Sequence, residues 1–257
     1  MKIGIVGVGF VGTAVKLAYE KVGIGLVCVD PLKGHTATFI DLNECSAVFV
    51  CVPSPVNDDG SCDTSYLEDV MQNLHDYKNV IISKVTAPAD IYLKLQQDHP
   101  TLVHTPEFLR AAHAVNDYQN QKFAIIGGLP DWCKVADEIL RLAQPIEKSI
   151  HIPIGEACIV KYLENSFLAT KVIFMNEIYN LCEVTGFDYD LVKAAIQLDT
   201  RQGHSHFDVP GPDGDLGFGG HCFPKDTSAL LKYAKDHGVD LTVLRQAVNQ
   251  NKIIRNC

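Results

Sequence analysis

A cysteine in the last sixth of the chain lies in a setting that favours a reactive sulfur. Residues 217–221, with three glycines, lead into Cys222 and let backbone pass close to a ligand without side chains in the way. Pro224 and Lys225 follow, and the helical run of residues 226–235 places Cys222 just ahead of a helix N-terminus. The helix end and the lysine both favour a thiolate. The segment predicts a nucleophile, with a buried structural cysteine as the alternative.

A second glycine-rich motif lies at the opposite end of the chain. The apolar strand of residues 2–6 runs into Gly7-Val8-Gly9-Phe10-Val11-Gly12, and a helical run from Thr13 to Lys21 follows. In this order the first glycines let the pyrophosphate of a dinucleotide approach, and the last lets helix pack on strand. The alternative is a glycine-rich turn of an unrelated α/β protein. The motif predicts cofactor contacts from Gly7, Gly9, Phe10, Val11 and Gly12.

An acidic residue follows at the distance that such a dinucleotide site requires. The second predicted strand, residues 25–29, ends in Asp30, which is 18 residues after Gly12. Its carboxylate would accept hydrogen bonds from the adenosine ribose and would repel a 2′-phosphate. The sequence therefore favours NAD over NADP, although nearby Lys33 leaves NADP open.

The following segments have the alternation of a parallel sheet. Short, β-branched apolar runs at 47–52, 80–83, 102–104 and 123–126 alternate with helical segments that include 64–74 and 131–142. Ligands of such sheets bind beyond the carboxyl ends of the strands, where Pro53, Thr86 and Glu107 lie. These patterns predict a Rossmann-like α/β domain over residues 1–152, with Pro53 and Thr86 beside the cofactor.

The pattern changes to helices after Pro153. A stretch from Glu156 to about Val184 has no Gly or Pro, and on it Lys161 and Asn165 share one face. Asn165 is a poor helix former in an apolar setting, which favours a functional role, whereas Lys161 also fits a solvated face. Further helices at 189–198, 226–235 and 239–254 complete an all-helical domain predicted over residues 153–257.

Composition excludes several classes of protein. A chain of 257 residues with 47% hydrophobic content can fold as two domains, and a net charge of −9 argues against nucleic acid and anionic membranes as partners. Nine scattered cysteines without a Cys-x-x-Cys pair fit the reduced thiols of a cytoplasmic protein. No apolar run approaches the ~18 residues that span a membrane. Turn residues and polar groups that bind hydroxyls explain the histidines and aspartates of residues 204–215 at least as well as a metal does, so no metal is expected.

Six motifs spread over nearly the whole chain resemble those of the UDP-glucose and GDP-mannose dehydrogenases. They are Gly7-x-Gly9-x-x-Gly12, Val52-Pro53-Ser54-Pro55, Pro106-Glu107-Phe108-Leu109-Arg110, Lys161-x-x-x-Asn165, Asp199-x-Arg201 and the run from Gly217 to Asp226. The last is highly specific. The resemblance implies oxidation of the C6 alcohol of a nucleotide sugar to a carboxylate with two NAD in succession, most commonly UDP-glucose to UDP-glucuronate.

The resemblance and the chemistry together imply roles for the motif residues. Because NAD accepts only two of the four electrons, Cys222 would hold the intermediate aldehyde as a thiohemiacetal and then a thioester. Lys161 and Asn165 would stabilise oxygen charge. Glu107 would activate the hydrolytic water, and Asp226 would orient a water or Lys161. Substrate contacts are implied for Phe108, Leu109, Arg110, Lys161, Asn165, Arg201, Phe218 and Gly219.

The implied quaternary structure is a homodimer. Arg201 resembles an arginine that reaches the sugar of the neighbouring subunit, with a plain surface arginine as the alternative. The long helix carries apolar groups on more than one face, which favours its burial in a dimer core. His221, beside the cysteine, would either stabilise the thiolate or face solvent.

Three departures from the family pattern stand out. Ala111 and Ala112 replace the usual Glu-Gly that follows Leu109-Arg110, and Lys84-Val85-Thr86 replaces the usual Ser-Thr-Val. The chain also ends where the family continues into a second Rossmann-like domain that grips the nucleotide. We expect a naturally short enzyme with weak substrate binding, whose nucleotide and sugar the sequence does not identify.

Two other functions fit part of the sequence. The β-hydroxyacid dehydrogenases also join a Rossmann domain to a helical one and carry Lys-x-x-x-Asn, but their single two-electron oxidation needs no cysteine. A non-catalytic NAD-binding protein would keep the glycine-rich turn and give no NADH with any nucleotide sugar. Cys222 and its motif favour the nucleotide-sugar dehydrogenase over both.

Overall fold

The computed structural model describes residues 1–256, apart from the side chain of Ala111. Cys257, the last residue of the predicted helical domain, lies outside the described residues. The chain divides into two compact units. The first comprises residues 1–57 and 62–161, and the second comprises residues 58–61 and 162–257.

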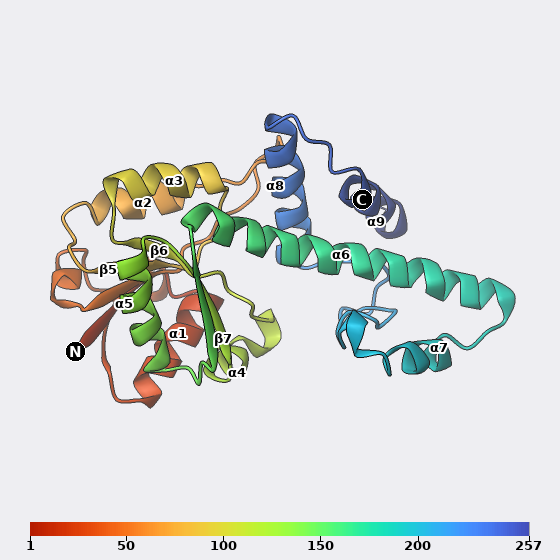
Figure 1. The fold of residues 1–257 in the computed structure, drawn as a ribbon, viewed down its shortest axis with the longest axis horizontal. Helices are drawn as coiled ribbons and strands as arrows, with labels where there is room; N and C mark the ends of the chain where they lie inside the picture. The colour runs from red at the N-terminus through yellow and green to blue at the C-terminus, as the bar shows by residue number, and fades with distance from the viewer. Residues whose placement is uncertain (257) are drawn as a thin grey trace. The chain divides into compact units, whose positions relative to one another are not determined.

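The first unit is built on one eight-stranded sheet with the order β3-β2-β1-β4-β5-β6-β7-β8 (Figure 1). The strands are β1 (Lys2–Val6), β2 (Gly25–Asp30), β3 (His35–Thr36), β4 (Ala47–Val50), β5 (Val80–Ser83), β6 (Leu102–His104), β7 (Phe123–Gly127) and β8 (Lys148–Ile152). Strands β2, β1, β4, β5 and β6 are parallel, with Ile5 of β1 aligned between Cys28 and Phe49. The predicted α/β class is confirmed.

Two strand pairs depart from the predicted parallel arrangement. β3 runs antiparallel to β2, and β7 runs antiparallel to β6, with β8 parallel to β7. The helix between β6 and β7 is α4 (Ala114–Gln119), whose six residues rise by about 9 Å. So short a helix does not carry the chain back to the start of the sheet. Among the described residues, the ladder between β7 and β6 consists of one aligned pair, His104 and Gly127.

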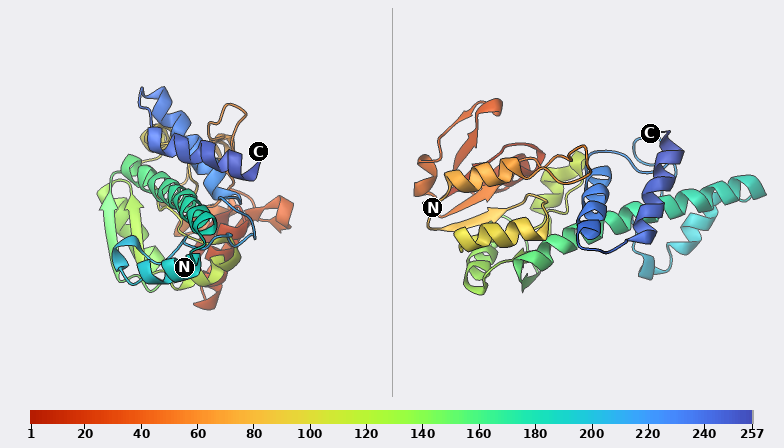
Figure 2. Two further views of the ribbon diagram at one scale, coloured as in Figure 1. Left: turned by 90° about the vertical axis from the view of Figure 1, so that its right-hand side faces the viewer. Right: turned by 90° about the horizontal axis from the view of Figure 1, so that it is seen from above.

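Helices cover both faces of this sheet, which explains why β4 and β5 are buried along their whole length. In Figures 1 and 2, α2 (Ser65–Asn73) and α3 (Ala89–Asp98) lie side by side over one face. On the other, α1 (Phe10–Lys21), α4 and α5 (Pro130–Arg141) pack against strand side chains. There Tyr19 contacts Phe49 with ring centroids 5.4 Å apart and donates a hydrogen bond to the Ile139 carbonyl at 2.8 Å.

The second unit is helical, as predicted, and is built on residues 162–185 of the 32-residue helix α6 (Ile154–Thr185). It also contains α7 (Tyr189–Ile196), α8 (Cys222–Asp236) and α9 (Thr242–Arg255). A small core joins α6 to α9, with Ala169, Ile173 and Ala247 packed around Phe218. Among the described residues, no helix is both long enough and apolar enough to cross a membrane.

A buried polar network fixes the end of β5, where the chain enters the crevice of the sheet. The Ser83 hydroxyl lies 2.5 Å from that of Tyr92, which donates to the Val85 carbonyl at 2.6 Å. His104 stacks on Tyr92 with centroids 4.6 Å apart, and its Nδ1 lies 3.2 Å from the Ser83 carbonyl. Burial is the main cause that lowers the pKa of His104 to about 3. The ring is therefore neutral in the folded protein.

The burial of the His104 ring predicts a loss of stability in mild acid. Below its ordinary pKa of about 6.5, His104 takes up a proton in the unfolded chain but not in the folded one. The free energy of unfolding should fall by up to about 1.4 kcal/mol per pH unit between pH 6.5 and pH 3. Urea unfolding of His104→Asn should show a shallower dependence there. The exposed control His113→Asn should keep the wild-type slope, and equal slopes in all three proteins would contradict the assignment.

Candidate active site

The glycine-rich turn between β1 and α1 has the close contacts that only glycine permits. Gly7 has a φ of +85°, and a Cβ there would lie 2.9 Å from the backbone of Cys51. A Cβ on Gly12 would lie 1.9 Å from the Gly7 carbonyl oxygen. A Cβ on Gly9 would meet no described atom within 4 Å. Two glycines thus shape the turn itself, while the third leaves space for a ligand.

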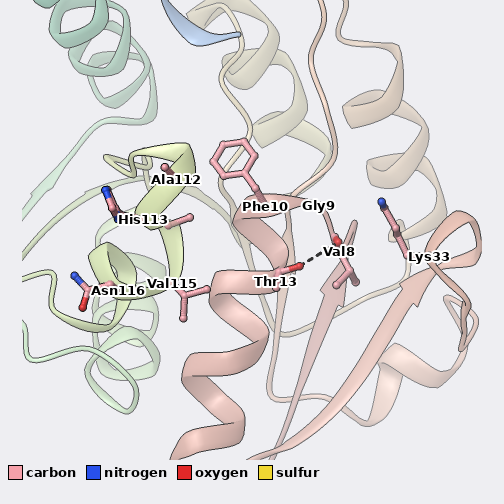
Figure 3. A pocket seen from close by; sticks show the side chains of 10 residues that line it. Val8, Gly9, Phe10, Thr13, Lys33, Ala112, His113, Val115 and Asn116 are labelled. Atoms are coloured by element: carbon pink, nitrogen blue, oxygen red, sulfur yellow. Dashed lines mark hydrogen bonds between the residues drawn. The ribbon is translucent and has the colours of Figure 1, made fainter. Parts of the chain in front are cut away.

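The carboxylate of Asp30 faces this turn. Its Oδ2 accepts a hydrogen bond from the Val8 amide at 2.7 Å, so Oδ1 can accept from a ribose hydroxyl. Gly9 caps α1 without a side-chain hydrogen bond, which leaves the first amides of the helix for an anion. A pocket of about 580 Å³ opens here (Figure 3). It is lined by Val8, Gly9, Phe10, Thr13, Lys33, Ala112, His113, Ala114, Val115 and Asn116. Val11 instead packs against the core.

The residues beyond β4 and β5 form the next part of the crevice. Pro53 is exposed and Thr86 is buried, with its carbonyl accepting from the Cys62 thiol at 3.5 Å. Sequence reasoning missed Lys84 as a component of the site. Its Nζ is buried, lies 5.7 Å from the centre of the Tyr118 ring, and has a pKa lowered to about 8 chiefly by burial. A lysine directly after an apolar strand was the available signal.

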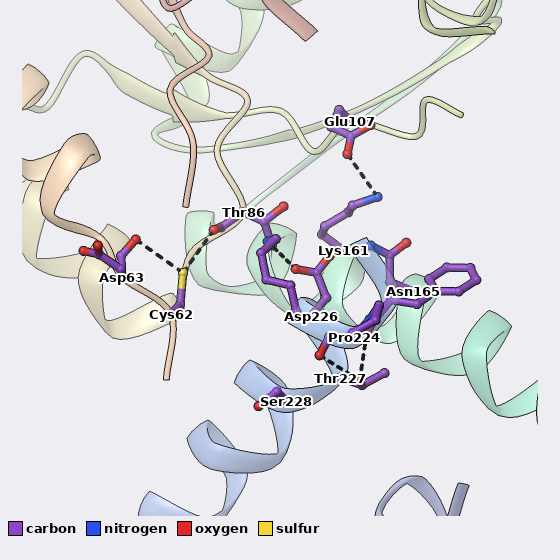
Figure 4. Close-up of polar contacts among 12 residues, drawn as sticks. Cys62, Asp63, Thr86, Glu107, Lys161, Asn165, Pro224, Asp226, Thr227 and Ser228 are labelled. Atoms are coloured by element: carbon purple, nitrogen blue, oxygen red, sulfur yellow. Dashed lines mark hydrogen bonds and ion pairs between the residues drawn. The ribbon is translucent and has the colours of Figure 1, made fainter. Parts of the chain in front are cut away.

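Glu107 and Lys161 face one another within the first unit (Figure 4). Lys161 Nζ lies 3.6 Å from Glu107 Oε1, and both residues are buried. The second oxygen, Oε2, accepts from the Leu109 amide at 2.8 Å, and the Phe108 ring centre lies 5.3 Å from Lys161 Nζ. This arrangement presents an acid and a cation together at the carboxyl edge of the sheet.

Two neighbouring candidates are held by other parts of the first unit. Leu109 is buried in the core. Arg110 is exposed, and its guanidinium binds Asp117 through two hydrogen bonds of 2.9 and 2.7 Å. The structure therefore places Glu107 and Phe108 with Lys161, and it places Leu109 and Arg110 elsewhere.

Asn165 and Asp226 form the corresponding polar centre of the second unit. The Asn165 amide nitrogen donates to Asp226 Oδ2, and both residues are labelled in Figure 4. Lys225 Nζ donates to Oδ1. Asn165 and Asp226 are both buried. Because each of its side-chain oxygens accepts a hydrogen bond, Asp226 is satisfied and orients the amide of Asn165.

Cys222 is the first residue of α8, so the prediction that this helix begins after the cysteine is wrong. Pro224 occupies the first helical turn, where its missing N–H costs no hydrogen bond. Cys222 is half-buried and lies four residues before Asp226, so both occupy one face of α8. His221 is the exposed N-cap residue and makes no side-chain cap bond.

The remaining candidates lie in the loop between α7 and α8. The side chain of Arg201 is 84% exposed and pairs with Asp199 of its own turn. Phe218 is buried, and Gly219 follows it next to the Arg255 guanidinium. No group of three or more potential metal ligands occurs within residues 1–256.

The turn, the ribose-facing carboxylate and the helical second unit together define the class of dinucleotide-dependent dehydrogenases. Comparison with known families narrows this class. Residues 31–144 match the NAD binding domain, and residues 155–253 the central domain, of one family. The chain belongs to the UDP-glucose/GDP-mannose dehydrogenase family. NAD is its cofactor, and the cradle at Gly7 and Gly12 with the Asp30 carboxylate fits it.

One relative by sequence and two solved structures illustrate what the chain is similar to. UDP-glucose 6-dehydrogenase TuaD of Bacillus subtilis is 29% identical over 98% of this chain, and the chain spans 63% of that protein. The UDP-glucose dehydrogenase structure from Pyrobaculum islandicum superposes with a TM-score of 0.84 at 24% identity, covering 98% of this chain and 68% of that one. The 3-hydroxyisobutyrate dehydrogenase structure from Mycobacterium tuberculosis superposes with a TM-score of 0.77 at 17% identity, covering 99% of this chain and 94% of that one. Both structures show the fold.

The glycine contacts predict separable effects of two methyl groups. Gly12→Ala places a methyl against the Gly7 carbonyl, so the free energy of unfolding without cofactor should fall by about 1–3 kcal/mol. Gly9→Ala should leave stability unchanged, because its φ of −72° suits alanine and its surroundings are open, yet it should weaken NAD binding by obstructing the pyrophosphate. Urea titrations and calorimetric NAD binding measure the two effects. A fully stable Gly12→Ala protein would refute the packing role.

Proposed function

We propose that this chain catalyses the NAD-dependent, four-electron oxidation of the C6 alcohol of a nucleotide sugar, with UDP-glucose as the first candidate. One observation carries the proposal beyond family membership. Cys222 begins α8 on the same face as Asp226, which holds the amide of Asn165. A thiol and an oxygen-stabilising amide are thus fixed through one helix within the second unit.

Several polar side chains would take part in the first oxidation. Bound NAD supplies the chemistry of hydride acceptance, once for each of the two oxidations. Lys161 and Asn165 would stabilise negative charge on the C6 oxygen as its proton leaves. The hydrogen bond to Asp226 orients the Asn165 amide, so its N–H direction is fixed before the reaction.

Cys222 would retain the reactive aldehyde between the two oxidations. Its thiolate adds to the aldehyde carbon as the carbonyl π bond opens to the alkoxide of a thiohemiacetal, and loss of a second hydride from that carbon re-forms the carbonyl and gives a thioester. The position at the start of α8 supports this role, because the amides of the first helical turn favour negative charge on sulfur.

Glu107 would complete the cycle as the base for thioester hydrolysis. It would take a proton from water, whose oxygen adds to the thioester carbon, and the thiolate would leave as the carboxylate forms. The buried contact with Lys161 supports this proposal because it holds the Glu107 side chain at the edge of the crevice. Asp30 would favour NAD over NADP through its ribose-facing oxygen.

A panel of UDP-glucose, GDP-mannose and UDP-N-acetylmannosamine, each with NAD, tests the function by NADH absorbance. Two NADH per sugar oxidised are expected with the preferred substrate. Cys222→Ser should lose nearly all acid formation, since an alkoxide is far harder to form than a thiolate near pH 7. Cys28→Ser, at a half-buried thiol of β2, serves as the control and should retain full turnover. Wild-type turnover in Cys222→Ser would instead favour the β-hydroxyacid dehydrogenase alternative.

Glu107→Gln should separate hydrolysis from oxidation. Without its base the enzyme should accumulate a sugar nucleotide attached to Cys222, visible by intact-mass spectrometry, while steady-state turnover falls by at least about a hundredfold. The control Glu138→Gln changes an exposed carboxylate of α5 and should turn over normally. Normal hydrolysis in Glu107→Gln would remove Glu107 from this role.

We also propose that the chain forms a homodimer through α6. Leu163, Phe167, Phe174 and Leu181 are spaced by four, seven and seven residues, so they form one stripe along the helix. Their exposed fractions lie between 55% and 63%, which is unusual for a row of large apolar side chains. A second copy would bury this stripe and bring Arg201 toward the neighbouring substrate.

Replacing one member of the stripe by a charge should dissociate the dimer. Phe167→Asp should give a monomer in light scattering at micromolar concentration, because an unpaired carboxylate would be buried at the interface. Val243→Asp, which changes an exposed apolar residue of α9, should remain dimeric. A wild-type monomer with full activity would overturn both the interface and the cross-subunit role of Arg201.

A further inference from the structure

The loop that precedes Cys222 is held by the side chain of Asn251 on α9. Asn251 Oδ1 accepts a hydrogen bond from the Phe218 amide at 2.7 Å, and its Nδ2 donates to the Phe218 carbonyl at 3.0 Å. Asn251 is buried, so these two bonds form away from competing water. One side-chain amide therefore binds both backbone groups of a single loop residue.

Two further side chains hold the residue before it. Asn176 Oδ1, from α6, accepts from the Gly217 amide at 2.9 Å, while its Nδ2 donates to the Val172 carbonyl at 2.8 Å and fixes the orientation of the amide group. Arg255 of α9 donates to the Gly217 carbonyl at 3.1 Å. Both backbone groups of Gly217 and of Phe218 are thus bound by side chains.

The glycines of the loop allow these side chains to approach. Gly217 has a φ of +73°, and a Cβ there would lie 2.5 Å from Asn251 Oδ1. A Cβ on Gly219 would lie 2.5 Å from the Arg255 guanidinium. A residue other than glycine at either position would displace the groups that hold the loop.

The held part of the loop is connected to the cysteine through an aromatic contact. Phe218 is buried in the small core between α6 and α9. Its ring lies edge-on to that of Phe223, with centroids 6.1 Å apart, and Phe223 is the residue next to Cys222. Residues 219–221 and Cys222 connect Phe218 to Phe223, and the rings of these two phenylalanines are in contact. The position of Phe218 therefore limits the position of Cys222.

We propose that Asn251, assisted by Asn176, is a positioning residue for Cys222. A leucine would fill a similar volume, but it would leave the amide and carbonyl of Phe218 without their partners. The inference rests on the proposed function, in which Cys222 is the nucleophile. Its structural part, the hold on the loop, can be measured without cofactor or substrate.

Asn251→Leu tests the inference against Asn249→Leu, an exposed asparagine of the same helix without a side-chain hydrogen bond among the described residues. Amide hydrogen exchange in a peptide covering residues 217–221 should be at least tenfold faster in Asn251→Leu and unchanged in Asn249→Leu. Turnover should fall at least tenfold in Asn251→Leu while the KM for NAD stays within twofold. If Asn251 contributed only to overall stability, Asn251→Leu would lower the temperature of thermal unfolding. Turnover of the folded protein would then not fall while the KM for NAD stays the same.

Asn251→Asp provides a second variant should the leucine protein not fold. It keeps the acceptor for the Phe218 amide and loses the donor to the carbonyl, so its exchange and turnover should lie between those of wild type and Asn251→Leu. Wild-type exchange and turnover in both Asn251 variants would overturn the proposal.

Failure of the positioning role of Asn251 can be distinguished from failure of the proposed function. Failure of the proposed function would appear in the unmodified chain, as absence of NADH with every nucleotide sugar. In that case the rate of Cys222 alkylation by iodoacetamide at pH 9.5, where an ordinary thiol is largely ionised, is measured in place of turnover. It should be several-fold faster in Asn251→Leu because a released loop exposes the half-buried sulfur. An unchanged rate would count against the positioning role.

Discussion

Burial of charged and amide side chains is the constraint on which the candidate site depends. A carboxylate or amide removed from water is tolerated only when protein groups replace its hydrogen bonds. Glu107 accepts a hydrogen bond from the Leu109 amide and forms an ion pair with Lys161, and Asp226 accepts from Asn165 and Lys225. Each group is consequently held in one orientation. The same bonds that make burial possible also prepare the groups for catalysis.

Much of the fold follows from local sequence, because the signals for its elements are local. The first β-α-β segment depends on glycines whose neighbours lie within a few tens of residues, and α6 depends on a long stretch without Gly or Pro. Strand direction was not predictable in the same way. An apolar run does not encode direction, and the reversal at β7 depends on the length of α4. The start of α8 was missed because Pro224 is compatible with more than one position of a first turn.

The residues of the candidate site also differ in whether the sequence alone predicts them. Motif residues such as Glu107, Asn165 and Cys222 could be nominated from the sequence because their types and spacing carry chemical meaning. Their partners could not. Asn251 and Asn176 bind backbone groups 33 and 41 residues away. Because a backbone amide or carbonyl does not depend on the residue type, the sequence gives no sign of such a contact. For Asn176 the available signal was an amide within the apolar helix α6, which is the signal that identified Asn165, whereas Asn251 lies between Gln250 and Lys252 and gave no such signal.

The hold on the loop has a consequence for how the sequence can vary. Asn251, Asn176 and Arg255 bind the main chain, so they do not depend on which side chains the loop carries. The exposed His221 is therefore open to replacement, whereas the two glycines that touch Asn251 and Arg255 are not. Mutational tolerance should differ sharply between adjacent positions of one short loop. A saturation library over residues 217–221 would record that contrast as a map of backbone contacts.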